Sequence, residues 1–277
     1  MNSRFVRWRI GRTLQRLIEK NGWSIREAAE ILGTNKDTLS RHLSGANDRY
    51  DPARILGWVM LLDGGEQLAY EMKHLADISS SRASGLAREH SGVPSWLITM
   101  EHEMSAIDMY QSELIHGLFQ IPSYMDAISE QDQTATSEIA EKSRLSKLKR
   151  QDATFNKTCG QPPSIRMILN DTCLTRLDGT SIKKFQVAHL VELNKEDNIG
   201  IYILAIRQGI HPSMDGSYSI MTLDQTSNFQ VVYTESLAGS QYYESPSRLE
   251  QYRKTFNATL AMSVELEEYL NANQHEA

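Results

Sequence analysis

Residues 23–45 read WSIREAAEILGTNKDTLSRHLSG, and this stretch determines the fold of the N-terminal part of the chain. Apolar residues recur at the i, i+3, i+4 and i+7 positions of residues 24–32, which predicts an amphipathic helix. Ser24 followed by Glu27 is a capping box, in which each side chain binds a backbone N–H of the first turn. Gly33 stands where a helix commonly ends in a left-handed residue. This half of the stretch therefore predicts a short helix and a tight turn.

The second half predicts another short helix, residues 36–44, which Asn35 would cap and Gly45 would end. Leu39 and Leu43 would be its buried residues. Two short helices joined by a glycine turn form a helix-turn-helix, whose second helix can enter the major groove of DNA. The short polar or cationic side chains predicted to face solvent, and suited to base edges and phosphates, are Lys36, Asp37, Thr38, Ser40 and Arg41.

The predicted DNA contacts also include the start of the first helix and the loop after the second. The full set is Ser24, Arg26, Asn35, Lys36, Asp37, Thr38, Ser40, Arg41 and Arg49. We expect Arg41 to contribute most, by reading a base edge. A phosphate contact, or an i, i+4 ion pair with Asp37, is the alternative role for Arg41.

Further helices complete the predicted N-terminal bundle. Residues 5–20 form the first, with inward-facing Ile10, Leu14, Leu17 and Ile18 and solvent-facing Arg9, Arg12 and Arg16. The pattern leaves open whether these arginines contact phosphates or only solvent. Residues 52–62 form another, after an Asp51-Pro52 start, with inward-facing Ile55, Leu56, Val59 and Met60. Residues 66–76 predict one more.

Residues 5–62 resemble helix-turn-helix regulators of the xenobiotic-response-element (XRE) type. The resemblance rests on an LG-x-S/N-x-x-T-LSR-x-x-SG run, which in this chain is LGTNKDTLSRHLSG over residues 32–45. The chain has Ile25 where members usually carry a glutamine that contacts phosphate, and Leu43 where they usually carry a glutamate. The resemblance implies a DNA-binding domain.

The composition is that of a globular protein. Of its 277 residues 40% are hydrophobic, and no apolar run approaches the roughly 20 residues that cross a membrane. The N-terminal MNSRFVRWRIGR is too charged for a secretory signal, so we expect a cytoplasmic protein with no membrane partner. The two cysteines, Cys159 and Cys173, could form one disulfide but no disulfide framework. We expect both to be free thiols in a reducing compartment.

Charge is divided unevenly along the chain. Residues 1–62 hold 11 Lys and Arg against six Asp and Glu, a net charge of +5. The remainder holds 18 against 29, a net charge of −11. A basic N-terminal part on an acidic body is expected when only the N-terminal part meets phosphates.

Residues 79–87 read SSSRASGLA, and most of them are small or polar. This stretch predicts a linker between a DNA-binding domain at 1–78 and a second domain at 88–277. In the second domain, residues 95–109 align Leu97, Met100, Met104 and Ile107 at helical spacing. Residues 136–155 predict a polar helix with inward-facing Leu145, Leu148 and Phe155. Its basic cluster, interpreted first as a solvated face, is Lys142, Arg144, Lys147, Lys149 and Arg150.

The period then changes to that of strands. Short β-branched or aromatic runs predict strands at 164–169, 199–205, 218–223 and 229–234. A helix at 182–194 would bury Phe185, Val187, Leu190 and Val191. Ser245-Pro246 opens a further helix, followed by a short one at 264–271. The predicted fold is a mainly α N-terminal bundle followed by an α+β domain, with a small sheet covered by helices.

Residues 88–270 resemble the uncharacterised C-terminal domain of actinobacterial regulators labelled antitoxin-like. The matching landmarks are the order and spacing of PSW at 94–96, GLFQ at 117–120, LKRQ at 148–151, VVYTE at 231–235 and YR at 252–253. Members usually pair two acidic residues where this chain has Asn170-Asp171, and carry a proline where it has Ala205. The resemblance implies a sensor or partner-binding role, commonly beside a small companion protein.

Known catalytic patterns are missing from the sequence. There is no GxGxxG after a strand, and no GxxxxGK[ST], HExxH or GxSxG run, so we predict no enzyme, no catalytic residue, no metal site and no cofactor. The residues predicted to bind a ligand or partner are Tyr110, Gln120, Tyr124, Tyr233 and Glu235. The alternative is that these tyrosines are packing residues with satisfied hydroxyls.

The sequence therefore predicts a transcriptional regulator that binds double-stranded DNA as a homodimer and senses a small-molecule effector or a small companion protein. The second hypothesis is an antitoxin-like protein that neutralises or chaperones a small partner and binds DNA only to regulate its own gene. An enzyme with a DNA-binding appendage has no positive feature in the sequence.

Overall fold

The computed structural model describes residues 4–47, 50–80, 104–132, 136–156, 161–224, 229–236 and 239–273. The chain divides into two compact units, Met1–Leu86 and Ala87–Ala277. No helix in the described ranges is both long and apolar enough to cross a membrane.

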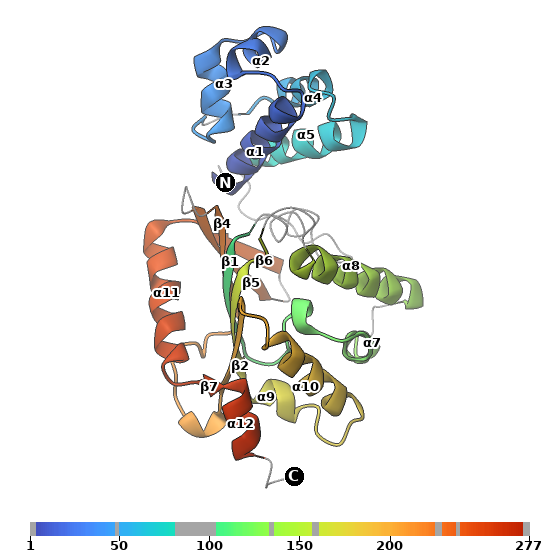
Figure 1. Ribbon diagram of the computed structural model, residues 1–277, viewed down its shortest axis with the longest axis vertical. Helices are drawn as coiled ribbons and strands as arrows, with labels where there is room; N and C mark the ends of the chain where they lie inside the picture. The colour runs from blue at the N-terminus through green and yellow to red at the C-terminus, as the bar shows by residue number, and fades with distance from the viewer. Residues whose placement is uncertain are drawn as a thin grey trace. The chain divides into compact units, whose positions relative to one another are not determined.

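The first unit is a bundle of helices (Figure 1). They are α1 (Arg4–Lys20), α2 (Ile25–Ile31), α3 (Lys36–Leu43), α4 (Pro52–Leu61) and α5 (Glu66–Ser80). The predicted capping residues are confirmed, because the side chains of Ser24, Asn35 and Asp51 accept hydrogen bonds from the first turns of α2, α3 and α4. Gly33 and Gly45 have φ angles of 62° and 71°, which a residue with a Cβ adopts only under strain.

The bundle core contains the predicted apolar residues of α1 together with Leu39, Ile55 and Val59. Gly11 lies where α1 meets α3. A Cβ at Gly11 would lie 2.4 Å from the Leu43 carbonyl oxygen, so the crossing requires glycine. Two predictions about faces are wrong. Arg9 is 8% exposed rather than solvent-facing, because its guanidinium lies 4.0 Å from the Glu71 carboxylate of α5. Met60 is 48% exposed rather than packed.

The second unit is built on a mixed seven-stranded sheet of order β6-β5-β4-β1-β2-β3-β7. The strands are β1 (Ala106–Gln111), β2 (Ser164–Asn170), β3 (Ile199–Leu204), β4 (Tyr218–Asp224), β5 (Phe229–Ser236), β6 (Gly239–Tyr243) and β7 (Val264–Glu265). The four predicted strands are present, but the sheet is larger than the small one expected. Strands β1, β2 and β3 run parallel, and β4 pairs antiparallel with β1.

Strand β1 corrects the prediction of a helix at 95–109. Residues 106–111 are extended and form the sheet's central strand, and residues 95–103 lie outside the described ranges. Met104 and Ile107 have helical spacing, but pairing with β2 on one side and β4 on the other determines the conformation.

Helices cover both faces of this sheet (Figure 1). On one face lie the 3-10 helix η1 (Gly117–Phe119), α7 (Pro122–Glu130), α8 (Ser137–Phe155), α9 (Thr172–Thr175) and α10 (Ile182–Leu193). On the other lies α11 (Pro246–Leu260), and α12 (Leu266–Ala272) follows the short strand β7. Two predicted core residues are solvent-facing, because Phe185 of α10 is 63% exposed and Leu145 of α8 is 47% exposed.

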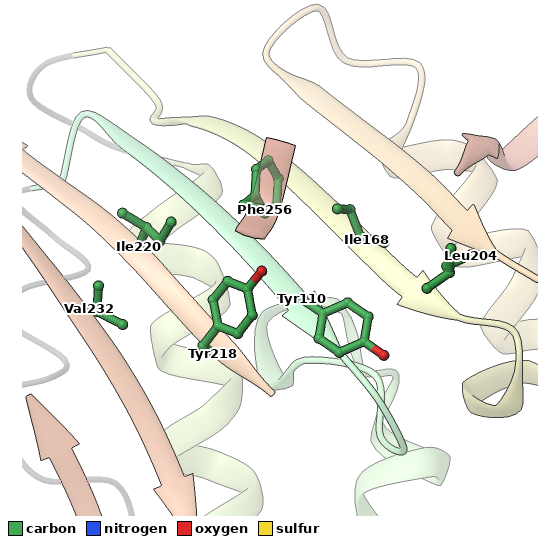
Figure 2. Close-up of a cluster of buried hydrophobic side chains, with 7 residues drawn as sticks. All are labelled: Tyr110, Ile168, Leu204, Tyr218, Ile220, Val232 and Phe256. Atoms are coloured by element: carbon green, nitrogen blue, oxygen red, sulfur yellow. The ribbon is translucent and has the colours of Figure 1, made fainter. Parts of the chain in front are cut away.

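The core beneath α11 is aromatic and aliphatic. Figure 2 shows Tyr110, Ile168, Leu204, Tyr218, Ile220, Val232 and Phe256, which are buried together. Beside them the Arg166 guanidinium pairs with both oxygens of Asp108, at 2.7 and 2.8 Å, and lies 5.0 Å from the Phe256 ring centroid. Neighbouring residues on a strand point to opposite faces, so Tyr233 points away from this cluster while Val232 points into it.

Candidate nucleic-acid interface

The turn between α2 and α3 is fixed by backbone contacts. The Thr34 N–H donates to the Ala29 carbonyl at 2.9 Å, across Gly33. The Asn35 Oδ1 accepts the Thr38 N–H at 2.8 Å, and the Ser24 Oγ accepts the Glu27 N–H at 3.3 Å. Ser24 and Asn35, both predicted DNA contacts, therefore cap the helices that carry the other contacts.

Helix α3 has one buried face and one polar face that is open to solvent. Leu39 is fully buried. Lys36, Asp37 and Arg41 are exposed, and Thr38 and Ser40 are half-buried. Arg41 and Asp37 form no ion pair within the described chain, so the i, i+4 alternative proposed for Arg41 is not realised in this conformation. The outward groups on α3 are a lysine, a guanidinium and hydroxyls, which can contact phosphates and base edges.

His42 holds α3 against the bundle, a role that the sequence analysis missed. Its ring is 4% exposed and packs edge-on against Tyr50 and Trp58, with centroids 5.0 and 4.9 Å away. Its Nδ1 lies 2.8 Å from the Thr38 carbonyl oxygen, and the Tyr50 hydroxyl donates to the His42 carbonyl at 2.8 Å. Burial lowers the pKa of His42, so the neutral ring is favoured. The charged neighbours Arg41 and Arg54 act in the same direction.

The remaining predicted contacts lie around α3. Arg26 is exposed and pairs with Glu30 at 3.6 Å. Arg49 lies outside the described ranges. Arg7 donates to the Asn47 carbonyl at 2.9 Å and so ties α1 to the segment after α3. Several cations of the first unit are exposed, among them Arg12, Arg16 and Lys20 of α1, Lys36 and Arg41 of α3, and Arg54 of α4.

The five predicted ligand residues of the second unit are not brought together. Tyr110 lies in the core beneath α11, whereas Tyr233 points to the face of the sheet covered by α8. Gln120 donates to the Ile115 carbonyl at 2.6 Å, and the Tyr124 hydroxyl accepts the Ile115 N–H at 3.4 Å. These two side chains therefore hold the loop before α7 in place.

The basic cluster of α8 is divided between solvent and interior. Lys142 and Lys149 are exposed, whereas Arg150 is 5% exposed. Lys147 donates to the Gln120 Oε1 at 3.2 Å, and burial together with the charge of Arg150 lowers its pKa. His116 has a pKa lowered to about 3 by burial and by these two cations. Glu235 interacts electrostatically with Lys147, and Tyr233 with Arg150 and Glu235. Three of the five predicted residues, Gln120, Tyr233 and Glu235, therefore adjoin the cluster.

A reactive thiol and a cluster of metal ligands are two features that could mark a chemical site, and the described part of the second unit holds a buried cysteine. Cys173 is fully buried, and burial raises the pKa of its thiol to about 12, which makes it unreactive. Cys159 lies outside the described ranges. Among the residues described, no group of three or more His, Cys, Asp and Glu side chains lies close enough to hold a metal ion.

Comparison with known proteins matches residues 95–269 to a family described as Domain of unknown function (DUF5753). The match spans the whole sheet of the second unit and excludes helices α1 to α5. No curated protein and no solved structure matches the chain.

Proposed function

This chain belongs to the DUF5753 family, and we propose that it is a sequence-specific DNA-binding transcriptional regulator whose helix α3 reads the operator. One observation carries the proposal. Helix α3 is capped, buried at Leu39 and His42, and fixed by the Gly33 turn, yet it exposes Lys36 and Arg41. A rigid helix with a cationic outer face, on an N-terminal segment of net charge +5, is suited to a major groove.

In this proposal α2 and α3 act as an XRE-type helix-turn-helix. Arg41 donates two hydrogen bonds to the O6 and N7 of a guanine, the commonest specific contact of arginine with DNA. Lys36, at the start of α3, binds phosphate, and Thr38 and Ser40 contact base edges or the backbone. Ser24 and Asn35 act by positioning these groups, because their side-chain oxygens cap the helices.

The second unit supplies control in this proposal. Residues 87–277 hold 16 Lys and Arg against 25 Asp and Glu, a net charge of −9, which disfavours contact of this unit with phosphates and leaves DNA binding to the first. A homodimer would place two α3 helices on half-sites one DNA turn apart, roughly 34 Å. A small effector or companion protein bound to the second unit would then alter operator binding.

The test is fluorescence-anisotropy binding to the gene's own upstream DNA and to a scrambled duplex, at two salt concentrations. Wild type is compared with Arg41→Ala and with Lys195→Ala, which removes another exposed cation, paired with Glu192 in the second unit. We expect salt-sensitive binding that prefers upstream DNA. Arg41→Ala should weaken this binding roughly tenfold or more, from about 1–3 kcal/mol of base discrimination, and Lys195→Ala should leave it unchanged.

Each result has a distinct meaning. An equal loss on both duplexes would make Arg41 a phosphate contact rather than a base reader. Wild-type binding without preference for upstream DNA would contradict the regulator. The antitoxin-like, partner-binding alternative would then become the first hypothesis.

A further inference from the structure

Residues 205–217 connect β3 to β4 across one end of the sheet. The sheet order places β2 and β1 between these two strands, so the connection crosses three strand spacings, about 14 Å. It begins with the 3-10 helix η2 (Ile206–Gln208) and passes the ends of all three parallel strands. We refer to residues 205–217 as the crossover loop.

Polar groups anchor the crossover loop from within. The Ser213 side chain is 2% exposed, and its Oγ lies 2.9 Å from the Tyr218 hydroxyl and 2.7 Å from the Thr259 hydroxyl. The His211 ring packs 5.6 Å from the Tyr110 ring. At the start of the loop, the Ile206 N–H donates to the buried Asp171 carboxylate at 3.0 Å. The loop is therefore fixed at its beginning, middle and end.

The large apolar side chains of the same loop point outward. Ile206 is 70% exposed, Ile210 is 88% exposed and Met214 is 61% exposed. This arrangement reverses the usual one, in which apolar groups are buried and polar groups face water. Apolar side chains that are held exposed on an anchored backbone lose little conformational freedom on association, and such patches commonly mark interaction sites.

The charges of the crossover loop indicate which partner fits. Arg207 follows Ile206 at the β3 end, and Asp215 follows Met214 at the β4 end. Both are exposed, and neither forms an ion pair with any residue that the structure describes. Arg207 interacts electrostatically with Tyr269 of α12 and Asp215 with Tyr252 of α11, as expected for opposite ends of the loop. A two-fold axis through the loop would place Arg207 of each copy against Asp215 of the other.

We propose that the crossover loop is the contact through which two copies of this chain associate. At the two-fold axis, the Ile210 side chains of the two copies contact each other. On either side of this contact, Ile206 of one copy packs against Met214 of the other. This inference supplies the contact for the dimer of the proposed function, but it requires no DNA. The loop provides only part of the roughly 800 Å² per partner that a stable interface buries, so we expect a reversible, micromolar dimer.

The test is sedimentation velocity of the full chain without DNA, over a series from low to high micromolar concentration. Wild type should shift from monomer to dimer across the series. Ile210→Asp should remain monomeric, because the substitution places a charge in the contact. Phe185→Asp, which changes an apolar residue of α10 that is 63% exposed, should behave as wild type. Circular dichroism would verify that each variant is folded.

A charge exchange tests the pairing itself. Arg207→Asp should weaken association, because like charges would then face each other across the axis. Combining it with Asp215→Arg should restore association, since the two ends have exchanged signs. A monomeric wild type at every concentration, or an Ile210→Asp variant that still dimerises, would overturn the proposal. Neither result would alter the Arg41→Ala comparison, so the two proposals fail separately.

Discussion

His42 shows how one buried side chain positions the surface that we propose reads DNA. It is part of α3, between the exposed Arg41 and the half-buried Leu43, but its ring packs against Tyr50 and Trp58. A carbonyl can only accept a hydrogen bond, so the contact with Thr38 places the proton on Nδ1. The Nε2 then accepts from the Asn47 amide at 2.9 Å. Both nitrogens are satisfied by the neutral ring.

This arrangement predicts a pH dependence for the first unit. The pKa of His42 is lowered by burial from 6.5 in the folded chain, so the unfolded chain binds the proton more readily. Stability is therefore complete above about pH 6.5 and decreases as the pH falls, by up to about 1.4 kcal/mol per pH unit. Urea unfolding followed by tryptophan fluorescence should give a lower midpoint at pH 5.5 than at pH 7.5.

His42→Gln is the matched variant for this measurement. The variant should be less stable than wild type at pH 7.5. Its urea midpoint should differ much less between pH 5.5 and pH 7.5 than the midpoint of wild type does. Glu27, whose pKa is lowered from 4.5 by its hydrogen bonds to Ser24, titrates below this window. Equal pH dependence in wild type and variant would show that another group is responsible.

At the scale of single elements, α10 shows where periodicity misleads. Phe185 was expected to be buried and is 63% exposed, whereas its polar neighbour Gln186 is fully buried. The Gln186 amide donates to the Phe119 carbonyl at 2.7 Å and accepts the Ile121 N–H at 3.0 Å. A glutamine thus joins α10 to the segment between η1 and α7.

Replacing the polar Gln186 should therefore lower the stability of the second unit more than replacing the apolar Phe185, the reverse of what hydrophobicity alone suggests. Gln186→Ala would leave a buried carbonyl and a buried N–H without partners and should destabilise the second unit by about 2 kcal/mol or more. Phe185→Ala should change stability by no more than about 0.5 kcal/mol, as surface substitutions usually do. Urea unfolding followed by far-UV circular dichroism measures both. A larger loss for Phe185→Ala would contradict the orientation of α10.

The sequence predicted best those elements whose bounds depend on residues close to them in the chain. The capping groups of Ser24 and Asn35 and the positive φ of Gly33 involve residues within a few positions, so the bounds of α2 and α3 were predictable. Strand β1 was not, because its conformation is determined by β2 and β4, which lie 50 to 110 residues later. The two-residue strand β7 likewise depends on distant pairing, because Val264 pairs with Ile203 of β3.

The candidate site divides in the same way. The exposure of Lys36 and Arg41 followed from helical spacing. The anchoring of His42 did not, because its aromatic neighbours come from later segments. The predicted ligand set is divided, because Tyr110 is in register with Tyr218 and Thr234, which places Tyr233 on the opposite face of the sheet from Tyr110. Only a known strand register could have shown this.

At the scale of the whole molecule, the two units have separate cores, one from α1 to α5 and one around the sheet. We therefore expect two thermal transitions in calorimetry. Gly11→Ala should lower only the transition of the first unit, because its Cβ would meet the Leu43 and His42 carbonyl oxygens at 2.4 and 2.6 Å. A loss of about 1–3 kcal/mol from overpacking corresponds to several degrees for a unit of this size.

Gly57→Ala is the control for Gly11→Ala. Gly57 is also helical, but a Cβ there would meet nothing within 4 Å, so alanine should be neutral or slightly stabilising. Tryptophan fluorescence assigns the transitions, since Trp8, Trp23 and Trp58 belong to the first unit and Trp96 to the second. A single transition, or equal shifts of both after Gly11→Ala, would contradict independent cores.

The central place of β1 has a consequence for how the protein is made. The ribosome completes β1 at Gln111, but its partner β4 begins at Tyr218, 107 residues later. At about 5–20 residues per second, one edge of an apolar strand remains without its partner for roughly 5–20 s of synthesis. Helices α1 to α5 are complete before this interval begins. We therefore expect the nascent second unit, rather than the first, to expose an unpaired strand edge during translation.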